Sequence, residues 1–173
     1  DVIYELPKYA ADDLSSELVR RGLLEFDRAK TKRITVKHGR NSLVLVRTGK
    51  GWNIESPPPP GKAEAASVGA LLGELSSLRA ASIADYAPGT LRRFGLDKPL
   101  TEVTVEAEDG KQQRLLLGKG LSGGKQRYAK IPERASVFVI SRTAGELAER
   151  DAAKYRPEKK PEPTGTGTGT TTP

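Results

Sequence analysis

The stretch "RITVKHGRNSLVLVRTGKGWNIES", residues 33–56, predicts three consecutive antiparallel strands. Ile34 and Val36 alternate with polar residues, which is the two-residue period of a strand with one buried face. Residues 39–41, Gly-Arg-Asn, supply turn chemistry between the first two strands. The proline run at 57–60 offers no N–H groups to a sheet, so we expect strand pairing to end there.

A second set of strands follows a helix. Residues 64–79 carry one apolar stripe at helical spacing, which predicts the main helix. The runs "TEVTVEAE", "QQRLLLG", "QRYAKI" and "SVFVIS" are typical of strands, and Asp109-Gly110 is a hairpin signal between the first two. Thr143 and Glu146 fit a capping box that opens a short helix. We therefore predict an α+β fold with about seven antiparallel strands in one or two sheets, one main packed helix and short terminal helices.

The chain divides into three predicted parts. The opening "DVIYELPKYAADDLSSELVRR" and the later "SVFVISRTAGELAERDAAKYR" share a strand, a polar break and a helix. Residues 1–27 are therefore interpreted as the end of a preceding similar unit, or as an N-terminal strand–helix arm. Residues 28–156 form the main domain. Residues 157–173, rich in Pro, Gly and Thr, are predicted to be a disordered linker because they bury little apolar surface.

The composition leaves few groups for catalysis or metal binding. The chain has no cysteine, which excludes a disulfide framework and a thiolate zinc site. A histidine-based metal site or catalytic triad would have to use His38, the only histidine. Asp27, Asn41 and Ser42 lie near His38 in sequence only, so we predict that His38 is a surface residue at the end of a strand. No catalytic residue, metal site or cofactor is predicted, and we expect the protein not to be an enzyme.

The glycine-rich segment 118–125, "GKGLSGGK", resembles a phosphate-binding loop but departs from its pattern. The lysine is displaced by one residue, and Gln126 stands where a hydroxyl should bind magnesium. A phosphate loop must also open a helix, whereas a short strand-like run follows here. We interpret the segment as a connection between two antiparallel strands. A nucleotide enzyme or hydrolase that uses this segment is kept as an alternative function, ranked below the two that are given at the end of this subsection.

The formal net charge of +7 is unevenly distributed. Residues 28–62 contain nine Lys or Arg and one acidic residue, and residues 111–150 contain nine and three. Such blocks can attract nucleic acid or anionic polymers. Alternation along solvated strands would produce the same pattern. The sequence contains no apolar run near the roughly 20 residues of a membrane span. It starts at Asp1 without a signal peptide, which suggests an excised or processed form.

Several segments, in this order, resemble the domain of unknown function 4340 family. They include "GKGWNIESPPPP", "VGALLGELSSLRA", "FGLDKP" and "VTVEAEDGKQQRLLLGK", within roughly residues 20–156. The resemblance implies a bacterial protein that is exported, tethered by an N-terminal membrane helix and encoded near gliding-motility-type ABC transporter components. It implies no catalytic residues.

Our functional hypothesis is a noncatalytic extracytoplasmic (periplasmic) interaction module that assists a membrane transporter or envelope complex. Its expected partner is a protein of that complex, and nucleic acid is not expected. Trp52, Arg47 and Tyr128 are the predicted binding residues; Trp52 lies in the first basic block and Tyr128 in the second. The alternative is a basic domain that binds a polyanion, although aromatic residues for stacking are sparse.

Overall fold

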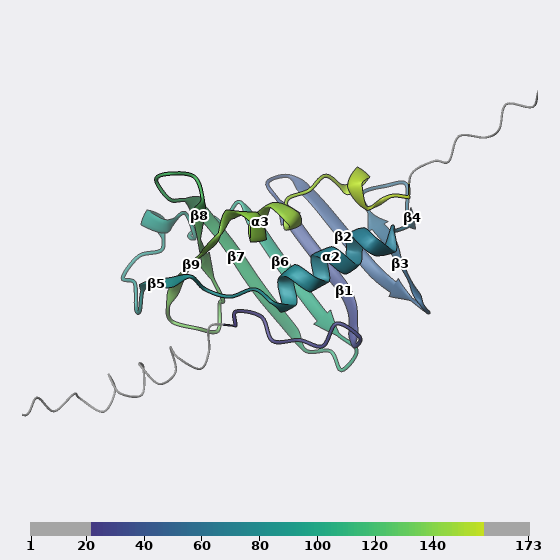
Figure 1. Cartoon of the computed structure of the whole chain (residues 1–173), viewed down its shortest axis with the longest axis horizontal. Coiled ribbons are helices and arrows are strands. Elements are labelled where there is room, and N and C mark those ends of the chain that lie inside the picture. Colours follow the sequence, from purple (N-terminus) through teal and green to yellow (C-terminus); the bar gives the residue numbers. More distant parts are fainter. Residues whose placement is uncertain (1–21, 158–173) are drawn as a thin grey trace, which may run out of the picture.

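A computed structural model describes residues 22–157 as one nine-stranded antiparallel sheet covered on one face by helices (Figure 1). The α+β prediction is therefore confirmed. The predicted arm up to residue 21 and the predicted linker from residue 158 onward lie outside the described residues. The elements, in chain order, are β1 (Thr31–His38), β2 (Asn41–Thr48), β3 (Gly51–Ser56), β4 (Gly61–Lys62), α2 (Ala65–Ser76), β5 (Ser82–Asp85), η1 (Arg92–Phe94), β6 (Thr101–Ala107), β7 (Gln112–Gly120), β8 (Gln126–Lys130), β9 (Val137–Ser141), α3 (Arg142–Ala148) and η2 (Ala152–Tyr155).

The strand order is β4-β3-β2-β1-β6-β7-β8-β9-β5. The two predicted sets of strands join into one sheet because β1 pairs with β6, which places Ile34 opposite both Leu45 and Val105. The prediction of seven strands was wrong because it omitted β4 and β5. β4 has only two residues and pairs with β3 beyond the proline run. β5 pairs with β9, more than 50 residues later in the chain.

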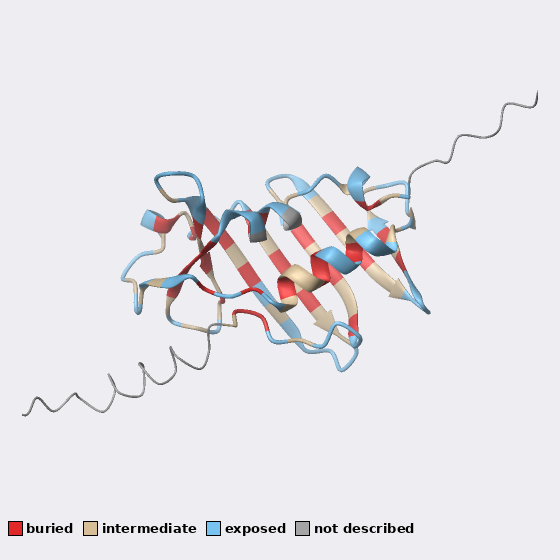
Figure 2. Ribbon diagram, viewed as in Figure 1, coloured by how far each residue is buried: buried red, intermediate tan, exposed pale blue. Residues whose placement is uncertain are grey.

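One core lies between the sheet and the helices. Figure 2 shows the buried residues in bands on the strands that α2 crosses. Leu23 and Leu24, which precede β1, are also buried in this core. Phe26 packs against it while staying half-buried. Each fully buried aliphatic side chain of this kind contributes roughly 1.5–3 kcal/mol relative to an exposed one.

α2 forms because both its start and its inner face are specified locally. Glu64 is the N-cap, and its carboxylate accepts a 2.6 Å hydrogen bond from the backbone N–H of Ser67. That bond to Ser67 keeps the pKa of Glu64 below its usual value. The stripe Val68, Leu71, Leu72 and Leu75 is buried against the sheet. The predicted helix 64–79 is confirmed with earlier termination, since the N–H of Ser77 already closes the last turn.

α3 begins differently from the prediction. It starts at Arg142 after Ser141, and no side chain caps its first turn. The predicted capping box of Thr143 and Glu146 is therefore wrong. Glu146 instead accepts a 3.0 Å hydrogen bond from Arg142 one turn earlier, so the acidic side chain is used in an i,i+4 ion pair.

A smaller cluster occupies the opposite face of the sheet near β8 and β9. Phe94 and Leu96, at the end of η1, pack there against Val137. The turn is closed by Gly95, whose φ of 68° is left-handed. This turn crosses β7 at Gly118, where a Cβ atom would lie 2.3 Å from the carbonyl oxygen of Phe94. Only glycine fits at that crossing.

The last described residues pack on the β3–β4 edge of the sheet and form hydrogen bonds with it. Tyr155, in η2, is the largest of the fully buried side chains. Its carbonyl accepts a 2.7 Å hydrogen bond from the N–H of Glu64, at the start of α2. Arg156 donates to the carbonyl oxygens of Pro57 and Pro59. These contacts hold the α3–η2 connection beside the β1–β2 hairpin.

Candidate functional site

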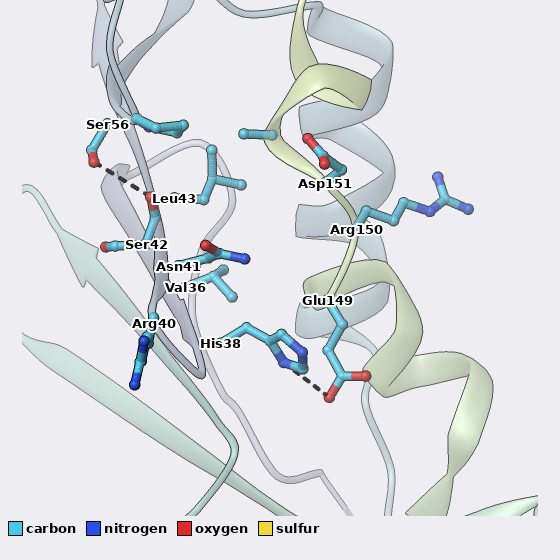
Figure 3. A pocket seen from close by; sticks show the side chains of 12 residues that line it. Val36, His38, Arg40, Asn41, Ser42, Leu43, Ser56, Glu149, Arg150 and Asp151 are labelled. Atoms are coloured by element: carbon cyan, nitrogen blue, oxygen red, sulfur yellow. Dashed lines mark hydrogen bonds and ion pairs between the residues drawn. The ribbon is translucent and has the colours of Figure 1, made fainter.

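A cavity of about 420 Å³ lies between the β1–β2 hairpin, the end of β3 and the α3–η2 connection (Figure 3). Its size is typical of the lower part of the range for small-ligand pockets. Its lining combines an apolar wall with polar and charged side chains. The lining residues are Val36, His38, Arg40, Asn41, Ser42, Leu43, Ser56, Pro57, Glu149, Arg150, Asp151 and Ala152.

His38 is held at one end of the cavity by a hydrogen-bond chain. Its Nδ1 lies 2.7 Å from the hydroxyl oxygen of Thr101, and that hydroxyl donates a 2.7 Å hydrogen bond to Oε1 of Glu149. Because the hydroxyl has one proton, already given to Glu149, the Nδ1–H of His38 is the donor to Thr101. In the neutral form of the ring, Nε2 is then the acceptor. Figure 3 shows the His38 ring and the Glu149 carboxylate directed toward each other.

Glu149 also neutralises a buried cation. Arg127 is 8% exposed, and its Nη1 donates to Oε1 of Glu149 while its Nη2 donates a 3.0 Å bond to the carbonyl of Gly118. Gly145 lets α3 approach this guanidinium, because a Cβ atom there would lie 2.8 Å from Nη1. Within residues 22–157 the Nε of Arg127 has no hydrogen-bond partner. The ion pair therefore connects β8 to the wall of the cavity.

These contacts set the ionisation of Glu149. Burial alone would raise the pKa of this carboxyl. The hydrogen bonds from Thr101 and Arg127, together with the positive charge of Arg127, outweigh burial and lower the pKa below its usual value. The folded state thus favours the ionised carboxylate, which gives the cavity a fixed negative group over the neutral pH range.

We expect Glu149→Gln to lower the free energy of unfolding at pH 7 by about 2 kcal/mol, because Arg127 loses its counter-ion. The folded-state pKa of Glu149 is depressed, so its contribution is present above the unfolded pKa of about 4.3 and is lost as the pH falls through the folded pKa. The difference between wild type and variant should therefore narrow below about pH 4. Urea unfolding at pH 7 and pH 3 measures it.

The matched control for that variant is Glu133→Gln, at an exposed carboxylate. It should change the unfolding free energy by less than about 0.5 kcal/mol at either pH. An equal and pH-independent loss in Glu149→Gln and Glu133→Gln would contradict the assigned role of the Arg127–Glu149 pair.

The opposite wall of the cavity is formed by the start of η2. Asp151 is its N-cap, and one carboxylate oxygen accepts a 2.8 Å hydrogen bond from the N–H of Ala153. The guanidinium groups of Arg40 and Arg150 point away from the space between the hairpin and this segment (Figure 3). Asn41, Ser42 and Ser56 also line the cavity, and their side chains can donate hydrogen bonds as well as accept them.

The model of one protein family, described as "Domain of unknown function (DUF4340)", matches residues 58–159. The chain belongs to the DUF4340 family. The match includes Glu149, Asp151 and the "FGLDKP" and "LLLG" segments, and it begins after His38 and Trp52. No curated protein matched the chain.

In this DUF4340 domain, the predicted binding residues lie outside the cavity. Arg47 and Trp52 are brought together as cross-strand partners, with the guanidinium carbon of Arg47 4.7 Å from the centre of the Trp52 ring. Arg47 also donates to the carbonyl oxygens of Thr31 and Arg28. Trp52 is 8% exposed and belongs to the core. These contacts are structural, and a role of the pair in binding stays a prediction.

Tyr128 lies apart from Arg47 and Trp52. It packs edge-on against Phe94, with ring centres 4.9 Å apart, on the face of the sheet that carries η1. Together with Arg93 and Leu121 it lines a shallower groove there. The three predicted residues therefore do not form one site, and a binding role for Tyr128 also stays a prediction.

The sequence prediction missed the cavity itself. His38 does end β1 as predicted, but its side chain is 36% exposed and lines the cavity, so it is only partly a surface residue. Its partner Glu149 lies 111 residues later in the sequence, and no local pattern joins them. The one available signal was the lone histidine beside a hairpin turn.

The glycine-rich segment 118–125 connects β7 to β8, as predicted for two antiparallel strands. Gly123 and Gly124 have φ values of 94° and 70°, so both occupy the left-handed region. A strand follows the segment, where a phosphate-binding loop requires the start of a helix. Over residues 22–157, no cluster of three or more His, Asp or Glu side chains is arranged to hold a metal ion.

Ion pairs engage seven of the eighteen cations in the two basic blocks. Five of the nine cations in 111–150 and two of the nine in 28–62 pair with carboxylates. These seven cations are Lys32, Arg33, Lys111, Arg114, Arg127, Arg134 and Arg142. The remaining eleven cations form no ion pair within residues 22–157, and polyanion binding stays a hypothesis. No helix in the described part of the chain is long and apolar enough to cross a membrane.

Proposed function

We propose that this DUF4340 domain is a noncatalytic binding module that recognises a protein partner through the cavity beside His38. The observation that carries the proposal is a cavity of about 420 Å³ whose polar wall is fixed from three sides. The β1–β2 hairpin supplies His38, and the ion pair with buried Arg127 holds the Glu149 carboxylate in place. The capped turn of η2 presents Asp151. A preorganised wall of this kind lowers the ordering cost of binding.

The proposed setting is an extracytoplasmic, membrane-associated assembly such as a transporter or envelope complex. This part of the proposal is supported by what the family resemblance implies. The described residues supply the recognition domain, and the tether to the membrane would come from another segment of the parent protein.

A tryptophan at the cavity mouth tests the proposed function. Asn41 is exposed and lines the cavity, so Asn41→Trp should block access while leaving the core unchanged. Lys50→Trp, in the exposed turn between β2 and β3, is the matched control. In affinity capture from an envelope fraction, wild type and Lys50→Trp should retain the same membrane-complex component. Asn41→Trp should retain at most about one tenth of the amount of that component that wild type retains.

Two results would contradict the proposed function. One is that wild type returns no component of a membrane complex. The other is that Asn41→Trp, shown by circular dichroism to be folded, retains the component as well as Lys50→Trp does. Either outcome would show that the cavity does not bind a component of a membrane complex.

A further inference from the structure

The chemistry of the cavity wall indicates what kind of group it receives. Val36, Leu43, Pro57 and Ala152 supply an apolar surface. An alkyl chain can pack on such a surface while a polar head reaches the far end. The volume of about 420 Å³ accommodates one long side chain with part of its flanking backbone.

Acceptor groups lie at both ends of the cavity, with His38 and Glu149 at one end and Asp151 at the other. His38 presents Nε2, because its Nδ1–H is used by Thr101. Glu149 favours its ionised form, but its negative charge is compensated by the ion pair with Arg127. Asp151 uses one oxygen to cap η2, and within residues 22–157 no cation forms an ion pair with it. Asp151 is therefore the carboxylate whose charge is available to a ligand.

The rim of the cavity has the opposite charge. Arg40 and Arg150 line the cavity, and their guanidinium groups extend outward from it in Figure 3. Neither forms an ion pair within the described part of the chain. Carboxylates in the lining together with a cationic rim complement a cation that is flanked by acidic groups. The net charge of +7 on the whole chain also favours approach of an acidic partner.

We infer that the cavity receives a lysine side chain from an acidic segment of the partner. The alkyl stem packs on Val36 and Leu43, which lie between His38 and Asp151, and the ammonium group binds Asp151 at the η2 end of the cavity. The acidic neighbours of that lysine meet Arg40 and Arg150. This inference rests on the proposed function and adds the chemistry of the ligand.

The single histidine offers a direct measurement, because the imidazole C–H signals in an NMR spectrum come from His38 alone. The probe is the peptide acetyl-Glu-Glu-Lys-Glu-Glu-amide, titrated into the folded chain at low salt. It should shift the His38 signals in a saturable manner. The same peptide with norleucine in place of lysine, which keeps the alkyl stem and lacks the charge, should bind at least about tenfold more weakly. Butylamine, which lacks the acidic flanks, should also bind more weakly.

Asp151→Asn is the matching variant, because asparagine still caps a helical turn while the charge is removed. It should weaken binding of the lysine peptide about tenfold, and the exposed control Glu133→Gln should leave it unchanged. The unshifted parts of the NMR spectrum verify that both variants are folded.

Three outcomes would overturn the inference. They are an unmoved His38 signal at saturating peptide, equal binding of the lysine and norleucine peptides, and an unchanged affinity in Asp151→Asn. Butylamine binding as tightly as the peptide would overturn the assignment to a protein lysine in favour of a free amine. If any of these occurs while Asn41→Trp still abolishes partner capture, the ligand chemistry fails and the binding module stands. Loss of capture by wild type would remove both.

Discussion

Gly118→Ala is expected to lower the free energy of unfolding by about 3 kcal/mol, at the upper end of overpacking effects. The added Cβ would lie 2.3 Å from the carbonyl oxygen of Phe94 and 3.0 Å from Cγ of Leu96. The first of these atoms is backbone, and it is held by the η1 turn and by Gly95 in its left-handed conformation. Relief of the clash requires η1 to move off β7. Urea unfolding followed by circular dichroism measures the loss.

Gly120→Ala is the matched control in the same strand. A Cβ at Gly120 would meet only the carbonyl oxygen of Gln126 at 3.7 Å, an ordinary contact. Its unfolding free energy should stay within about 1 kcal/mol of wild type. Similar losses in Gly118→Ala and Gly120→Ala would show that η1 does not pack rigidly on β7.

The Gly118 contact also gives a physical meaning to two of the segments on which the family resemblance rests. "FGLDKP" contains the η1 turn, and "LLLG" ends at Gly118 in β7. The two segments pack on each other at the crossing. Their residue types are explained by packing, so they do not by themselves indicate a ligand site.

Elements with a complete local pattern were predictable. The first hairpin followed from Ile34 and Val36 alternating with polar residues and from a turn at Gly39, whose φ is 57°. α2 followed from its apolar stripe and from Glu64 at its start. In each case, neighbouring residues in the sequence determine the conformation, so the pattern is present without knowledge of the rest of the fold.

Long-range pairing was not predictable from such patterns. The joining of two strand sets into one sheet depends on pairing between β1 and β6, whose partner residues are 63 to 76 positions apart in the sequence. β5 has four residues and only intermediate or exposed side chains, so alternation cannot reveal it. Arg127 is buried at a position where strand alternation favours an apolar residue, and its counter-ion lies in α3–η2. The cavity could not be predicted for the same reason, because its walls come from segments that only the tertiary fold brings together.

Tyr155→Ala is expected to have the largest effect, a loss of about 3–5 kcal/mol in the free energy of unfolding. Tyr155 is 1% exposed and packs in the main core with the residues of α2. Its removal leaves a cavity and frees η2 from the sheet. Because Asp151 and Ala152 belong to the same turn, the wall of the ligand cavity should loosen as well. Binding of the lysine peptide in the cavity should therefore weaken in any Tyr155→Ala protein that remains folded.

Tyr155→Phe separates the ring from its hydroxyl and supplies the control. Keeping the ring should limit the loss at pH 7 to about 1 kcal/mol. Burial raises the pKa of Tyr155 to about 12, against about 10 in the unfolded chain. The fold thus favours the protonated phenol, and this contribution is complete below about pH 10 and lost as the pH rises to about 12. Between about pH 10 and about pH 12, the free energy of unfolding of wild type should fall by roughly 2–3 kcal/mol more than that of Tyr155→Phe. Urea unfolding measures both. Equal alkaline losses in the two proteins would contradict the burial of an un-ionised phenol beneath η2.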